Sequence, residues 1–214
     1  MRDRIHLKIC GMRDAENILS VAELQPYYMG FIFYPTSKRF VGSQFEIPEL
    51  LPKSIKRVGV FVNEMTKEIL RLTNKHDLDF IQLHGGESVR QCAALKENGL
   101  GVIKVFSVDN HFDFKEVKPY KGTIDYVLFD TKSEYYGGTG RTFDWNSINK
   151  YDQQIPFFLS GGLNATNLEK TNDLVNMNLH ALDINSGVEI SPGVKSVDKI
   201  VEFKNILKHN IDRQ

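Results

Sequence analysis

The chain has 214 residues, of which 27 are basic and 27 acidic, so its formal net charge at neutral pH is zero. This balance argues against nucleic acid or an anionic membrane surface as a partner, and no apolar run approaches the roughly 18 residues needed to cross a bilayer. With 41% hydrophobic and 25% charged residues, the composition is that of a globular protein with a sizeable core. The two cysteines, Cys10 and Cys92, are far apart and no secretory signal pattern precedes them, so we expect free thiols and a cytoplasmic location.

Short apolar segments rich in β-forming residues recur along the chain at intervals of roughly 20 to 30 residues. In chain order they are Ile5–Ile9, Met29–Phe33, Arg57–Val62, Phe80–Leu83, Val102–Phe106, Tyr126–Phe129, Pro156–Leu159 and Ala181–Ile184. We predict that each of these segments is a β-strand.

More polar stretches lie between these segments, and several have the spacing of amphipathic helices. They are Ala15–Leu24, Glu64–Leu72, Glu87–Glu97, Asn164–Val175 and a last helix that begins at Ser196. Asp14 is placed to cap the first of them. After the second and fifth apolar segments, at Phe45–Leu51 and Phe112–Val117, the pattern predicts only short helical turns.

Alternation of strands and helices at this spacing predicts a parallel sheet covered by helices. Eight such units in about 200 residues match a small (βα)8 TIM barrel, so we expect residues 1–214 to form one α/β domain with a parallel eight-stranded barrel. An open doubly wound sheet is the main alternative. It is disfavoured because Cys10-Gly11-Met12-Arg13, and no G-x-G-x-x-G motif, follows the first predicted strand.

In a (βα)8 barrel, the chemistry takes place at the carboxyl ends of the strands. The polar side chains at or after these predicted ends are Lys8, Cys10, Arg39, His84, Asp130 and Asp183. Gly161-Gly162 and Ser186-Gly187 follow the seventh and eighth predicted strands. In many barrels these two loops bind a phosphate group through backbone N–H groups and the amino end of a short helix.

Each of these residues also has a plain structural interpretation. Cys10 can be a small buried hydrophobic residue, although Lys8, on the same side of the strand, would lower its pKa. Asp130 can cap a helix or pair with Lys132, and Arg39 can be a solvated surface charge. The glycine pairs can be tight turns, and His84 can be a hydrogen-bonded structural residue. The role of Asp183 can be limited to holding loops together.

Several strings of residues stand at or near the predicted strand ends. They are Lys8-Ile9-Cys10-Gly11, Gly30-Phe31-Ile32-Phe33 with Ser37-Lys38-Arg39-Phe40-Val41, Val58-Gly59-Val60-Phe61-Val62, Gln82-Leu83-His84-Gly85, Gly137-Gly138-Thr139-Gly140, Ser160-Gly161-Gly162-Leu163, Asp183 with Ser186-Gly187-Val188-Glu189, and Pro192-Gly193-Val194-Lys195. In this order, through nearly the whole chain, they resemble the motifs of phosphoribosylanthranilate isomerases.

The resemblance implies an aldose–ketose isomerase that carries out the Amadori rearrangement of N-(5-phosphoribosyl)anthranilate in L-tryptophan biosynthesis. By resemblance, Asp130 is the general acid that protonates the furanose ring oxygen, and Cys10 is the general base that takes a proton from the second sugar carbon. We therefore expect Asp130 to hold a proton near neutral pH and the site to favour the thiolate of Cys10.

The resemblance also assigns the substrate-binding residues. Arg39 matches the residue that contacts the anthranilate carboxylate, and Asp183 matches a sugar contact. The substrate-binding set is Arg39, His84, Gly138, Gly140 and Asp183, and the phosphate-binding set is Gly161, Gly162, Ser186 and Gly187. No metal or organic cofactor is implied, because the Schiff base is itself the electron sink. The expected partner is the small-molecule phosphosugar alone, and the chain is expected to be a monomer or a homodimer.

Two positions depart from the family pattern: Lys38 stands where proline is frequent, and Asn185 where a small residue, frequently serine, is common. Among competing enzymes, a metal-dependent epimerase would need a His/Asp ligand set that His84 alone does not supply. An isomerase that also serves histidine biosynthesis would be expected to have aspartate in place of Cys10. The non-enzyme alternative is a phosphosugar-binding barrel that has lost catalysis.

Overall fold

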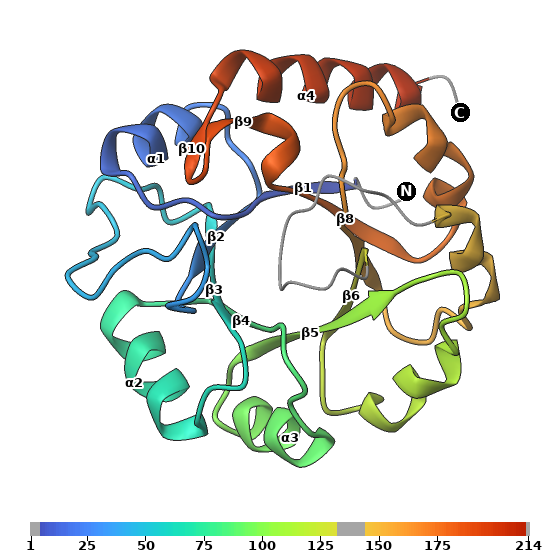
Figure 1. Cartoon of the computed structure of the whole chain (residues 1–214), viewed down its shortest axis with the longest axis horizontal. Coiled ribbons are helices and arrows are strands. Elements are labelled where there is room, and N and C mark those ends of the chain that lie inside the picture. Colours follow the sequence, from blue (N-terminus) through green and yellow to red (C-terminus); the bar gives the residue numbers. More distant parts are fainter. Residues whose placement is uncertain (1–4, 132–143, 213–214) are drawn as a thin grey trace.

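The computed structural model describes residues 5–131 and 144–212. Eight parallel strands pair in chain order and close into a barrel, with helices around the outside (Figure 1). The strands are β1 His6–Ile9, β2 Tyr28–Ile32, β3 Lys56–Phe61, β4 Phe80–Leu83, β5 Gly101–Val108, β6 Tyr126–Thr131, β7 Phe157–Leu159 and β8 Leu179–Ile184. Each of the eight predicted segments coincides with one of these strands, so the predicted (βα)8 barrel is confirmed.

Two buried layers follow from the alternation of side chains along each strand. One face of every strand packs against the surrounding helices, as Phe129 and Leu182 do. The other face fills the barrel interior, where Leu128 and Ala181 lie in a second buried cluster. Because the side-chain period is two, Asp130 and Asp183 point to the same side as Leu128 and Ala181, and so face the interior at the carboxyl ends.

Aromatic rings fill the opposite, amino-terminal end of the barrel. Tyr28, Tyr126, Phe158 and His180 have ring centroids 4.3 to 5.9 Å apart. The Tyr28 hydroxyl and His180 Nε2 lie 2.7 Å apart, so one donates a hydrogen bond to the other. Because rings fill this end, the open space in the barrel lies at the carboxyl ends, where the polar residues face the interior.

The helical segments differ from the predicted ones in their bounds and, in part, in their type. The α-helices are α1 Ala15–Ala22, α2 Thr66–His76, α3 Val89–Glu97 and α4 Val197–Asp212, and the 3₁₀ helices are η1 Phe114–Tyr120, η2 Trp145–Lys150, η3 Leu168–Asn176 and η4 Ser186–Val188. The Asp14 side chain accepts a hydrogen bond from the N–H of Asn17, which confirms the predicted cap of α1. Of the helices that the structure describes, none is long and apolar enough to cross a membrane.

Two predicted helical segments differ in extent from the observed ones. The short helical turn predicted within residues 45–51 is a single turn, in which the N–H of Leu51 donates to the carbonyl of Pro48, because Pro48 and Pro52 each lack a backbone donor and push the preceding residue toward extended backbone. The helix expected from Asn164 begins only at Leu168, as η3. The Asn164 side chain instead accepts hydrogen bonds from the N–H and the hydroxyl of Thr166, which makes a local turn that competes with a helix start.

A small antiparallel hairpin lies outside the barrel and was not predicted. It consists of β9 Glu189–Ser191 and β10 Val194–Lys195, between β8 and α4 in the chain. Figure 1 shows it beside α1, and the Asn17 side chain exchanges two hydrogen bonds of 2.8 Å with the backbone of Lys195. The hairpin is therefore fixed to the rim of the barrel next to the end of β1.

Candidate functional site

A pocket that is open to solvent lies at the carboxyl ends of the strands. Its lining includes these predicted site residues: Cys10, Arg39, His84, Asp130, Gly161, Gly162, Asp183, Ser186 and Gly187. Gly138 and Gly140, the other two predicted substrate-binding residues, lie outside the described residues. The structure thus brings together residues from the ends of β1, β2, β4, β6, β7 and β8 in one cavity.

Lys8 and Asp183 form a buried ion pair in the wall of this pocket. Lys8 Nζ lies 2.9 Å from Asp183 Oδ2, and the two side chains are 0% and 4% exposed. Burial alone would lower the pKa of Lys8, but the charges of Asp183 and Cys10 reverse this and raise it. The second carboxylate oxygen, Asp183 Oδ1, is buried and has no hydrogen-bond partner among the described residues. It is therefore a free acceptor for a hydroxyl group.

The pKa of the Cys10 thiol differs from what the sequence predicted. Burial raises the pKa of Cys10, and the charge of Lys8 offsets only part of this effect. In the unliganded pocket the thiol form is therefore favoured, whereas the sequence predicted a site that favours the thiolate. The position of the sulfur depends on Gly30 of β2, because a Cβ there would lie 2.7 Å from Cys10 Sγ. Gly30 leaves the space that the side chain of Cys10 needs.

On the other side of the pocket, Gln82, His84 and Asp130 form a chain of polar contacts. Gln82 Nε2 lies 3.3 Å from His84 Nδ1, and His84 Nε2 lies 3.3 Å from Asp130 Oδ2. When the amide of Gln82 donates to Nδ1, a neutral His84 carries its proton on Nε2 and directs it at the carboxyl group. The backbone N–H of Thr131 donates to the other oxygen, Asp130 Oδ1, at 2.8 Å. These two contacts fix the orientation of the Asp130 carboxyl group.

Arg39 is buried and is paired with a residue that the sequence reasoning gave no role. Its Nε and Nη2 each donate to one oxygen of Glu189, both at 2.7 Å. Glu189 also accepts from Lys195 Nζ at 2.8 Å and from the N–H of Gly193 at 3.0 Å. This pairing raises the pKa of Arg39, so the guanidinium stays charged. Arg39 is therefore a fixed cation in the pocket wall and no solvated surface charge.

The glycines after β7 and β8 allow two loops to approach each other closely. Gly161 and Gly162 have φ angles of +93° and +73°, in the region that side chains rarely adopt. A Cβ on Gly161 would collide with the Thr131 hydroxyl, and one on Gly187 would collide with the carbonyl of Leu163. The short helix η4 begins at Ser186 directly beside them. Backbone N–H groups on two bare loops are the arrangement that binds a phosphate group.

Four further pocket or rim residues were missed by the sequence reasoning: Gln82, Thr131, Glu189 and Lys195. Gln82 could have been found, because it precedes His84 by two residues on one strand and so points to the same side. No local sequence pattern singles out Thr131. Its place in the site follows only from the fold, in which its hydroxyl is buried without a partner among the residues described. Within the described part of the chain, no group of three or more His, Cys, Asp or Glu side chains is placed to hold a metal ion.

Comparison with known proteins agrees with this geometry. The family model described as N-(5'-phosphoribosyl)anthranilate (PRA) isomerase matches residues 7–205. The chain belongs to the phosphoribosylanthranilate isomerase family. A curated relative from Phocaeicola vulgatus is 43% identical over 205 residues, which cover 96% of this chain and 98% of the relative. One from Parabacteroides distasonis is 40% identical over 206 residues, covering 95% and 93%. Both are named N-(5'-phosphoribosyl)anthranilate isomerase.

Solved phosphoribosylanthranilate isomerases have the same fold. The Thermotoga maritima enzyme superposes with a TM-score of 0.84 at 37% identity, over 96% of this chain and 100% of the other. Another, with a TM-score of 0.81 at 34% identity and the same coverage, was solved in complex with reduced 1-(o-carboxyphenylamino)-1-deoxyribulose 5-phosphate. The family expected from the motifs is therefore confirmed, and these relatives are enzymes that act on a small-molecule phosphosugar.

Proposed function

We propose that this chain catalyses the Amadori rearrangement of N-(5-phosphoribosyl)anthranilate to 1-(2-carboxyphenylamino)-1-deoxyribulose 5-phosphate, a step of L-tryptophan biosynthesis. The observation that carries the proposal is the pocket itself, which is lined by a thiol, a carboxyl group, a buried arginine and two glycine loops. A substrate with a sugar between an aryl carboxylate and a phosphate needs these groups together. Membership of the phosphoribosylanthranilate isomerase family supports the same reaction.

Asp130 acts as the general acid in this proposal. It donates a proton to the furanose ring oxygen, the bond from this oxygen to the first sugar carbon breaks, and the nitrogen lone pair forms a protonated Schiff base. His84 and the N–H of Thr131 hold the carboxyl group in place for this transfer. A positioned acid of this kind typically contributes about 10²- to 10⁴-fold in rate.

Cys10 acts as the general base. It removes a proton from the second sugar carbon, and the electron pair neutralises the Schiff base to give an enolamine that tautomerises to the ketone. Burial keeps the thiol protonated in the resting enzyme. The protonated Schiff base brings a positive charge beside the sulfur and lowers the thiol pKa, so the thiol first releases its proton to solvent through the open pocket, and the thiolate then takes the proton from carbon. This chemistry needs no metal or organic cofactor.

The remaining groups bind the substrate. Arg39 contacts the anthranilate carboxylate through the guanidinium edge that Glu189 leaves open. Asp183 Oδ1 accepts a hydrogen bond from a sugar hydroxyl, and His84 lines the same part of the pocket. The phosphate lies against the backbone of Gly161, Gly162, Ser186 and Gly187. Gly138 and Gly140, which lie outside the described residues, are proposed from their sequence alone to bind the substrate.

The test is conversion of freshly generated N-(5-phosphoribosyl)anthranilate, followed by the loss of anthranilate-type fluorescence in the presence of a metal chelator. Rapid conversion supports the proposal. A protein that binds the product analogue but converts no substrate would instead be the non-catalytic phosphosugar-binding barrel.

We further propose that residues 1–214 act as one catalytic domain in the cytoplasm, as a monomer or a homodimer. Both cysteines are buried and free, which is compatible with a reducing compartment. The phosphoribosylanthranilate isomerase of Thermotoga maritima is described as dimeric, and the solved relative consists of monomers generated from it. Sedimentation equilibrium of the purified chain at several concentrations would distinguish the two states.

A further inference from the structure

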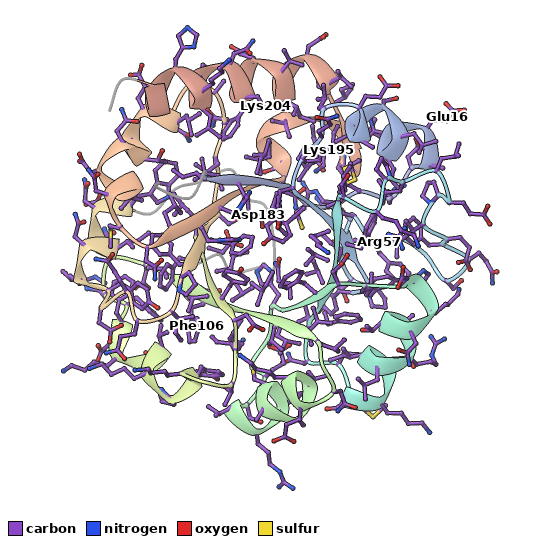
Figure 2. All side chains as sticks on the ribbon, turned by 180° about the vertical axis from the view of Figure 1, so that it is seen from behind. Glu16, Arg57, Phe106, Asp183, Lys195 and Lys204 are labelled. Carbon is purple, nitrogen blue, oxygen red and sulfur yellow. The ribbon has the colours of Figure 1, made fainter. Side chains whose placement is uncertain are left out.

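A buried cluster of charges lies directly behind the mouth of the pocket, around Glu189. It contains two cations, Arg39 and Lys195, and one anion, Glu189, with the amide of Asn185 beside them. These residues come from the loop after β2, from the end of β8 and from both strands of the β9–β10 hairpin. In Figure 2, Asp183 lies inside the ring of strands and Lys195 lies between this ring and α1. None of these contacts belongs to the acid–base pair.

The ammonium group of Lys195 is fully occupied by the protein. Its side chain is 0% exposed and donates to Asn185 Oδ1 at 2.6 Å, to the Asn185 carbonyl at 3.2 Å and to Glu189 Oε1 at 2.8 Å. An ammonium group has three donors, so none remains for a ligand. Asn185, one of the two departures from the family pattern, supplies two of the three acceptors. Lys195 therefore acts through its charge and its contacts.

Arg39 is only half occupied. Nε and Nη2 contact Glu189, while Nη1 has no hydrogen bond to any residue that the structure describes, and Arg39 lines the pocket. Gly11 makes this geometry possible, since a Cβ there would lie 2.8 Å from Arg39 Cδ and 2.8 Å from Asn185 Oδ1. The guanidinium plane is thus fixed on one edge by Glu189 and presents its other edge to a ligand.

The charges of the cluster do not cancel. One carboxylate faces two cations, so the cluster has a surplus of up to one positive charge at the pocket wall, and burial lowers the pKa of Lys195 to about 8. The neighbouring ion pair Lys8–Asp183 is neutral in itself. A buried surplus charge is costly unless a ligand of opposite charge pairs with it. A ligand with a carboxylate at this point completes the cluster, whereas the same ligand without one leaves the charge unpaired.

We propose that Glu189 is the positioning residue that holds the Arg39 guanidinium in place, and that Glu189 and Lys195 together make the pocket select a substrate with an aryl carboxylate. The inference rests on the proposed function, because it concerns how that reaction's substrate is chosen. Glu189 contacts the two cations Arg39 and Lys195 and no reacting atom, so it acts on the substrate by holding these cations in place.

The experiment compares kcat/KM for N-(5-phosphoribosyl)anthranilate with kcat/KM for N-(5-phosphoribosyl)aniline, which lacks the carboxylate. Wild type prefers the carboxylate substrate by roughly 10- to 100-fold, as expected for a charge-assisted hydrogen bond. In Arg39→Ala this preference falls to within about threefold of unity. In Glu189→Ala it falls at least about threefold, because the guanidinium is no longer held in place although its charge remains. In the double variant Arg39→Ala/Glu189→Ala the preference is no lower than in Arg39→Ala, because the group that Glu189 positions is already gone. Additive losses in the double variant would overturn the proposal.

Lys195→Met separates charge from positioning. Here Glu189 still holds Arg39 but the surplus charge is gone, so KM for the carboxylate substrate rises at least about tenfold, the factor expected for a unit charge about 12 Å away at an effective dielectric constant of about 20. The aniline substrate shows no such rise. An equal change of KM for both substrates would show that Lys195 is only structural, and would contradict its part of the proposal.

The matched control is Glu87→Gln, which breaks a second buried ion pair, Glu87–Lys104, at 3.0 Å and with 0% and 4% exposure. This pair has no contact with Arg39, so the substrate preference is unchanged even if stability falls. Glu189→Gln, which keeps one acceptor oxygen, gives an intermediate preference and guards against a misfolded Glu189→Ala. A wild-type protein that converts no substrate would refute the proposed function. An active wild type whose substrate preference is unchanged in Glu189→Ala would refute only this inference.

Discussion

The buried ion pair Lys8–Asp183 gives a prediction whose size follows from the structure. The two side chains are 0% and 4% exposed, and their charged atoms lie 2.9 Å apart. Lys8→Met leaves the Asp183 carboxylate buried without its cation. Removing one partner of such a pair costs about 3–5 kcal/mol in the free energy of unfolding, a large part of the roughly 5–15 kcal/mol that holds a domain folded.

The loss depends on pH in a direction that can be worked out. Burial raises the pKa of Asp183, and Lys8 works against this rise, so the pKa rises further in Lys8→Met. The pKa of a carboxyl group is near 4 in the unfolded protein. When the pKa in the folded protein is higher, the group's contribution to stability is fully present below the unfolded pKa and is lost as the pH rises through the folded pKa. The difference in unfolding free energy between wild type and Lys8→Met is therefore smaller at about pH 5 than at about pH 8.

Urea unfolding at both pH values, followed by circular dichroism, measures this difference. The double variant Lys8→Met/Asp183→Asn, in which no charge is left unpaired, recovers part of the loss at pH 8. The control is Glu68→Gln, which breaks the exposed pair Glu68–Arg71, with 35% and 57% exposure, and costs less than about 1 kcal/mol. A Lys8→Met loss that is equally small, or that is independent of pH, would refute the reasoning.

Three further predictions concern the acid–base pair. Gly30→Ala places a Cβ 2.7 Å from Cys10 Sγ, so we expect kcat to fall at least about tenfold while the thermal midpoint stays within a few degrees; unchanged turnover would contradict the close contact. Gln82→Leu removes the donor that orients His84 toward Asp130, so kcat should fall roughly tenfold with KM little changed, and a change in KM alone would argue against this role. Burial raises the pKa of Cys10, so kcat/KM of the wild type, which reports the free enzyme, should still be rising between about pH 7 and 9. In Cys10→Asp, kcat/KM should reach its plateau at lower pH. A wild-type plateau already below about pH 8 would contradict the buried thiol.

The positions of the strands could be predicted because each carries its own signal. A run such as Tyr126–Phe129 is apolar on both faces, as a strand buried between the barrel interior and the helices must be. The period of two then places Asp130 and Asp183 on the interior side without further information. Where a helical spacing meets proline or a side-chain turn, as at Pro48 and Asn164, the spacing alone predicted helical segments longer than the observed ones.

The charge network could not be predicted because it depends on contacts between distant parts of the chain. Arg39 and Glu189 are 150 residues apart, and no local pattern shows that they meet. The same holds for the pKa of Cys10: the sequence shows the nearby cation Lys8, but only the fold shows that burial outweighs it. Gly138 and Gly140 remain predictions from the sequence.

The central claim, that Cys10 and Asp130 form the acid–base pair, is tested most directly by the turnover of N-(5-phosphoribosyl)anthranilate in wild type, Cys10→Ala and Asp130→Ala. Binding of the reduced product analogue and the unfolding midpoint serve as controls for a folded, intact pocket. We predict that each variant binds the analogue within about tenfold of wild type while kcat falls by about 10²- to 10⁴-fold. A folded variant of either kind that keeps turnover close to wild type would contradict the assignment.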